Sequence, residues 1–98
     1  MNLDVFHDMI VNLRGAFKEA GADERGTWPD GFRIGVLRVH LDGNEPDVTL
    51  APENTEDARR RPCAVVNLRQ NQSDMAWALR SLKTQWKTDA DRLRPHTE

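Results

Sequence analysis

Apolar residues recur at alternating steps of three and four near both ends of the chain, and the middle lacks this spacing. The first segment has Leu3, Phe6, Ile10, Leu13, Phe17 and Ala20, and the second has Met75, Leu79, Leu82, Trp86 and Leu93. Such spacing places side chains on one stripe of an α-helix, so each segment predicts an amphipathic helix with one side to bury. Gly21 stands where a left-handed residue would end the first helix. Ser73 or Asp74 would cap the second helix, which we expect to end near Arg94 and Pro95.

Three short segments between these helices have the features of β-strands. Residues 32–41 carry apolar side chains first on one parity and then on the other, with Gly35 beside the change, which indicates a β-bulge. A turn containing Asp-Gly and a proline leads into a second strand at residues 47–51. The third strand is predicted from three alternating apolar residues, Ala64, Val66 and Leu68.

Two further segments connect these elements. Residues 22–31 are rich in turn formers and predict a loop held in place by Trp28. Residues 52–62 begin acidic and end basic, an order that suits a short helical turn before Pro62, and a plain loop fits them equally well.

The predicted order is therefore α-β-β-β-α in one α+β domain over residues 1–94, with a frayed tail at 95–98. The most economical packing is a three-stranded antiparallel sheet with two amphipathic helices on one face. A length of 98 residues is enough for one modest core. The alternative is a helical dimer seam, although each stripe covers only about two or three heptads.

This order of elements is similar to that of double-stranded-RNA-binding domains. The resemblance concerns topology alone. The second helix starts with Ser73 and Asp74, where those domains have a basic helix start, and the first hairpin carries the acidic stretch 43–47. No RNA-contacting residue is therefore assigned from the resemblance.

The composition indicates a soluble chain. No apolar run approaches the roughly 20 residues that a membrane-spanning helix needs, and no secretory signal pattern is present, so we expect no membrane partner. A single cysteine, Cys63, allows no internal disulfide and fits a reducing compartment. We therefore expect a cytoplasmic protein of bacterial or phage type.

Charge is unevenly distributed along the chain, with a formal charge of −7 on residues 1–57 and +5 on residues 58–98. The carboxylates around the middle strand could attract a basic protein surface. They are Asp42, Glu45, Asp47, Glu53, Glu56 and Asp57. Their simpler role would be to protect an edge strand from pairing with other chains.

Trp77 is the best single candidate for a binding residue. It lies roughly 170° around the second helix from the apolar stripe, and Arg80 and Thr84 lie near it. A tryptophan opposite a core face often anchors an interface, and the alternative is that it packs under a loop or against a strand.

The basic residues suggest an alternative function, because they could contact the phosphates of a nucleic acid. They are Arg59, Arg60, Arg61, Arg69, Arg80, Lys83 and Lys87. An isoelectric point near 5.9 lies far below that of typical basic nucleic-acid-binding domains. A solvated surface balanced by acidic neighbours is the simpler interpretation.

The patterns for enzymatic chemistry are weak. Asp4, His7 and Asp8 could supply two metal ligands at helical spacing but need distant partners. Cys63 is expected to be a buried, inert thiol, and Arg38 with His40 has no nucleophile placed beside it. We expect a non-enzymatic interaction protein, such as an inhibitor, adaptor or assembly factor, without metal or cofactor. It could also form a homodimer by pairing acidic and basic surfaces.

Overall fold

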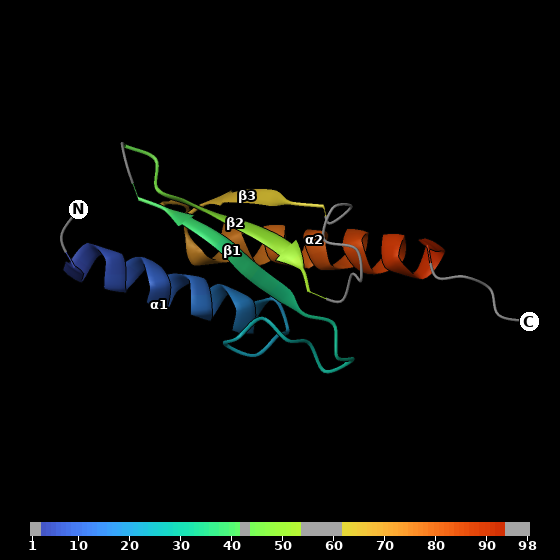
Figure 1. The fold of residues 1–98 in the computed structure, drawn as a ribbon. Coiled ribbons are helices and arrows are strands. Elements are labelled where there is room, and N and C mark those ends of the chain that lie inside the picture. Colours follow the sequence, from blue (N-terminus) through green and yellow to red (C-terminus); the bar gives the residue numbers. More distant parts are fainter. Residues whose placement is uncertain (1–2, 42–43, 54–61, 94–98) are drawn as a thin grey trace, which may run out of the picture.

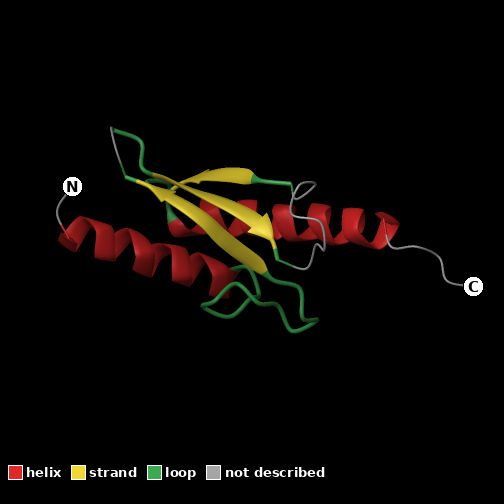
Figure 2. Cartoon of the chain, viewed as in Figure 1, coloured by secondary structure: helices red, strands yellow, loops and turns green. Residues whose placement is uncertain are grey.

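The computed structural model describes residues 3–41, 44–53 and 62–93. It contains, in order, α1 (Leu3–Glu19), β1 (Ile34–His40), β2 (Asp47–Pro52), β3 (Ala64–Asn67) and α2 (Gln72–Leu93). The strands form one antiparallel sheet in the order β1-β2-β3, which confirms the predicted α+β class (Figure 1; Figure 2). The short helical turn considered for residues 52–62, and the tail at 95–98, fall mostly or wholly outside the described residues.

One face of the sheet carries the core. Val48 and Leu50 of β2 are fully buried, and they pair with Val39 and Val36 of β1 on one side of β2. Both helices contribute to the same hydrophobic cluster. Of the stripe predicted for the first helix, Leu13, Phe17 and Ala20 are buried in this cluster, whereas Leu3 is 83% exposed, so the stripe is internal only toward the end of the helix. The opposite sheet face is open at Val65, which alternates with the buried Val66 and is 65% exposed.

The end of α1 has a defined glycine cap. Gly21 has a φ of +99°, as predicted, and its N–H donates to the carbonyl of Lys18. The N–H of Ala22 donates to the carbonyl of Phe17 at 2.9 Å. These two bonds form a Schellman motif, which satisfies carbonyls at the end of the helix and turns the chain into the loop.

The loop between α1 and β1 is held by Trp28, as predicted. The Trp28 indole N–H donates to the carbonyl of Ala20 at 3.2 Å, and its ring meets Phe17 edge to face at a centroid distance of 6.3 Å. Lys83 and Lys87 of α2 both reach the carboxylate of Asp30, at 2.9 and 2.8 Å. The loop is therefore fixed at one end by α1 and at the other by α2.

The predicted β-bulge is present in β1, where the register with β2 shifts between Val36 and Arg38. Gly35 is not the bulged residue, because it pairs regularly with Ala51. The side chain of Glu53 occupies the space that a Cβ at Gly35 would need. Gly35 thus permits a close approach from β2, and the bulge lies two residues further along.

The cap predicted for α2 was wrong by two residues. Asn71 caps the helix, because its Oδ1 accepts a hydrogen bond of 2.8 Å from the N–H of Asp74. Asp74 lies in the first turn, where its negative charge suits the helix dipole. Asn71, Ser73 and Asp74 are all good capping residues, and packing against α1 and β3 selects among them.

Candidate docking surfaces

Trp77 lies on the side of α2 that faces away from the core, and it is 66% exposed. Met75 and Leu79 on the other side of the same helix are completely buried, which fixes the orientation of α2. Among the residues that the structure describes, Trp77 therefore packs neither under a loop nor against a strand.

Arg80 and Thr84 are exposed on the same helix, near Trp77. The Arg80 guanidinium Nη1 donates to the carbonyl of Glu19 at 3.3 Å. This contact places a positive charge at the C-terminal end of α1, where the helix dipole favours it. Trp77, Arg80 and Thr84 are called the Trp77 face below.

The other two tryptophans are buried in the core. Trp28 is 7% exposed and Trp86 is 3% exposed, and both belong to the hydrophobic core. Trp77 is thus the one tryptophan of the three whose indole ring is open to a partner.

The predicted acidic surface is only partly described, because Asp42, Glu56 and Asp57 lie outside the described residues. The other three carboxylates, Glu45, Asp47 and Glu53, do not gather at one place. Glu45 precedes β2 and Glu53 follows it, so they lie at opposite ends of the strand. Asp47 lies 3.8 Å from His40, and Glu53 forms a 3.1 Å ion pair with Arg33.

The predicted basic patch is likewise divided. Arg59, Arg60 and Arg61 lie outside the described residues, and Arg69 is exposed beside α1 rather than on α2. Lys83 and Lys87 are both bound to Asp30, so they hold the loop. Of the predicted patch on α2, Arg80 alone lies on the Trp77 face.

Asp30 is the most strongly perturbed carboxylate among the described residues. Its hydrogen bonds with Lys87, then with Lys83 and the backbone N–H of Phe32, hold its pKa well below the usual range. Both lysines bind the same oxygen of Asp30 and so connect the loop to α2. The lowered pKa is therefore explained by a structural contact.

The candidates for chemistry do not assemble into a site in the described parts of the chain. His7 and Asp8 are exposed on α1, with 3.9 Å between the His7 Nδ1 and an Asp8 oxygen, and Asp4 is exposed as well. No group of three or more potential metal ligands occurs among the residues that the structure describes. Cys63, just before β3, is exposed rather than buried, so the prediction of a buried thiol was wrong. Arg38 and His40 lie on the open sheet face.

A groove that the sequence did not predict runs between α1 and the free edge of β1. Its walls are Ile10, Leu13 and Phe17 of α1 and Ile34, Gly35, Val36 and Val39 at the edge of the sheet. Its rim carries the charged residues Arg14, Glu24, Arg25, Arg33 and Glu53. This set is called the α1–β1 groove below. The bulge in β1 places both Val36 and Val39 on the helix side of the sheet, opposite Leu50 and Val48. The sequence pattern could not reveal that α1 leaves these two valines uncovered.

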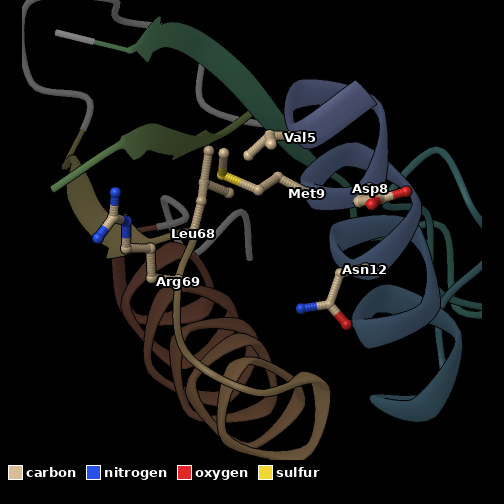
Figure 3. A pocket seen from close by; sticks show the side chains of 6 residues that line it. All are labelled: Val5, Asp8, Met9, Asn12, Leu68 and Arg69. Atoms are coloured by element: carbon tan, nitrogen blue, oxygen red, sulfur yellow. The ribbon is translucent and has the colours of Figure 1, made fainter. Parts of the chain in front are cut away.

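A second, shallower cleft lies on the other side of α1. In Figure 3, Val5 and Met9 of α1 point toward Leu68, and the amide of Asn12 points toward the segment after β3. The Asn12 side chain donates to the carbonyl of Gln70 at 3.3 Å. This bond joins α1 to the turn between β3 and α2, so the cleft is a packing seam.

Two further findings concern membrane-spanning helices and similarity to known proteins. No helix within the described residues is long and apolar enough to cross a membrane. Comparison of the chain with protein-family models, curated proteins and solved structures finds no match in any of the three.

Proposed function

We propose that this chain is a small, non-enzymatic interaction protein of the cytoplasm, an inhibitor, adaptor or assembly factor of bacterial or phage type. It binds a protein partner through the Trp77 face. The observation that carries this proposal is the 66% exposure of Trp77 on a helix whose opposite side is fully buried.

An exposed tryptophan suits this role for a physical reason. Its large ring removes much apolar surface from water on binding and loses little conformational entropy, and tryptophan and arginine are enriched among residues that dominate binding energy. Arg80 and Thr84 supply hydrogen-bond donors beside the ring. The Arg80 contact with Glu19 orders the guanidinium before a partner arrives.

The carboxylates around β2 have a secondary role in this proposal. Asp47 and Glu53 already face His40 and Arg33, so of the three described carboxylates around β2 the exposed Glu45 is the one without an ion pair to another described residue. Such a charge speeds encounter with a basic partner more than it adds affinity. Its contribution should therefore fall as salt screens it.

The test is affinity capture from a lysate of the source organism at low salt, with and without nuclease, followed by mass spectrometry. The bait is the wild-type chain, the Trp77→Ala variant or a Val65→Ala control, which truncates an equally exposed residue on the sheet. We expect a nuclease-resistant protein that Trp77→Ala loses and Val65→Ala retains. With the purified partner, Trp77→Ala should weaken binding by about 30-fold or more.

Direct nucleic-acid binding through the basic residues is the competing function. It predicts that recovery disappears with nuclease, and that affinity falls steeply with salt and is lost in Arg60→Glu. Either result would replace the protein-interaction proposal. Retention of the same protein by Trp77→Ala would show that the docking face lies elsewhere.

A further inference from the structure

The α1–β1 groove exposes residues that belong to the core side of the sheet. Val36 is 48% exposed and Val39 is 38% exposed, whereas their direct neighbours on β2, Leu50 and Val48, are fully buried. The difference arises because α1 packs its last turns against α2 and makes few contacts with β1. Apolar surface of this kind gains free energy when another surface covers it.

The backbone at the same edge is also directed outward. The N–H of Ile34 donates to Gly26 across the free edge, at 2.9 Å, so the loop covers the first residue of β1. Backbone groups alternate in direction along an antiparallel strand, and the bulge inserts one residue. Val36 and Val39 therefore direct their backbone groups to the free edge, beyond the part that the loop covers.

The rim of the groove carries charges of both signs. Glu53 pairs with Arg33 at 3.1 Å and Glu24 with Lys18 at 3.7 Å. Arg14 and Arg25 form no ion pair with another residue that the structure describes. A partner surface that carries only one sign of charge would face some rim residues of the same sign. A second copy of the rim, rotated by a twofold axis, can instead place its carboxylates opposite the arginines of the first.

We propose that the α1–β1 groove is the interface with a second copy of this chain, related by a twofold axis. Each groove then packs on the other, β1 lies antiparallel to its copy, and the exposed apolar residues of the two chains cover each other. Identical surfaces associate isologously, which suits a rim containing both charge signs. The anatomy fits a homodimer, with apolar side chains at the centre and charged residues around them.

This dimer is independent of the proposed function, since no residue of the Trp77 face lines the groove. A stable interface buries about 800 Å² on each partner, which requires α1 and β1 to contribute together. Of the exposed large hydrophobic residues in the described parts of the chain, Val36 and Val39 line the groove itself. Leu3, Val11 and Leu37 lie elsewhere on the same two elements, and Val5 lines the cleft on the other side of α1.

The first experiment measures molar mass by light scattering and sedimentation from micromolar to near-millimolar concentration. The wild type should reach twice the chain mass of 11.2 kDa. Val39→Lys should raise the dimer dissociation constant by at least about tenfold, because it places a charge in the apolar centre. Val65→Lys, the same change on the open sheet face, should leave dimerisation unchanged. Val36→Lys serves as a second groove variant, and circular dichroism checks that each variant is folded.

The second experiment tests the charge matching. Arg14→Glu/Arg25→Glu and Glu24→Arg/Glu53→Arg each give the rim one dominant sign, so each variant alone should be monomeric. Mixed in equal amounts, they should form a heterodimer. A monomeric wild type at the highest concentration would overturn the proposal. So would a dimer that tolerates both lysine variants in the groove, or variants that do not associate on mixing. Trp77→Ala should remain dimeric, which separates this result from the test of the Trp77 face.

Discussion

The helix side of the sheet is closed over the central strand β2 and open at the edge strand β1, and these two regions are called the closed end and the open end below. Val48 of β2 is fully buried beneath the helix layer, whereas Val39, directly opposite it on β1, is 38% exposed. The two residues are of the same type and lie on the same face of the same sheet. Their different burial shows that the position of the helices, rather than the pattern of the strands, decides which part of the sheet becomes interior.

The closed end is built around α2 and the loop that precedes β1. Met75, Leu79 and Trp86 of α2 are buried, and Asp30 joins the loop to the same helix through two lysines. At the open end, α1 makes its main contacts with α2 rather than with β1. Stability should therefore depend on α2 and the loop, and the open end should be the region available for association.

The largest change in the free energy of unfolding should come from Trp86→Ala. Removing this buried ring leaves a large cavity, which should lower the free energy of unfolding by about 3–5 kcal/mol. Trp77→Ala is the matched control on the same helix, and because Trp77 is 66% exposed it should change stability by no more than about 0.5 kcal/mol. Urea unfolding followed by circular dichroism measures both. Similar losses for the two variants would contradict the assignment of Trp77 to the outer face.

A smaller loss of stability should distinguish the closed end of the sheet from the open end. Val48→Ala removes two buried carbons and leaves a cavity, so it should cost about 2–3 kcal/mol. Val39→Ala should cost less than about 1 kcal/mol in the isolated chain, because water already reaches the side chain. The measurement is again urea unfolding, at a concentration where light scattering shows monomer. Equal costs would mean that the α1–β1 groove is closed in solution.

Much of this fold could be predicted from the sequence because each element carries its own periodicity. The two helices, the bulge in β1 and the glycine at the end of α1 are local features, and each was confirmed. The stripe predicted for the first helix was buried only in part, because Leu3 at its start is 83% exposed. The cap of α2 was misplaced because Asn71, Ser73 and Asp74 are chemically similar, and the choice depends on where α2 packs.

The candidate surfaces were less predictable, since they depend on the relative positions of distant segments. The helical period identified the exposed side of Trp77, but only packing could exclude a loop above it. The lysines expected to bind phosphate, Lys83 and Lys87, instead hold Asp30, which lies more than fifty residues earlier in the chain. No pattern in the sequence predicts that the α1–β1 groove is left uncovered.

Asp30 allows a test of the clamp at the closed end by pH. Its pKa is lowered from an ordinary 3.8 by Lys87, Lys83 and the N–H of Phe32, so the ionised form stabilises the fold. This stabilisation is complete above pH about 5, and it is lost as the pH falls below 3.8 toward the lower pKa of the folded state. Asp30→Asn should therefore lower the melting temperature at pH 7, and the difference from wild type should shrink in acid.

The matched control is Glu45→Gln, which also removes one carboxylate but at an exposed position without a lysine partner among the described residues. Melting curves by circular dichroism from neutral to acidic pH give both differences. If the Asp30→Asn difference stayed constant down to the lowest pH, the two lysines would not be acting on an ionised carboxylate.

The smallest effect, a gain in stability, should come from Gly15→Ala at the point where α1 meets α2. Alanine favours a helix interior over glycine by about 1 kcal/mol, and at Gly15 the new Cβ would meet only the far end of the Gln72 side chain. That side chain can move at the cost of a weak, exposed 3.4 Å hydrogen bond to Glu19. We therefore expect a net gain below about 1 kcal/mol, measured by urea unfolding. In a Gln72→Ala background the full gain should appear, because nothing then opposes the Cβ. A loss of stability in both backgrounds would mean that the backbones of α1 and α2 approach too closely for any side chain.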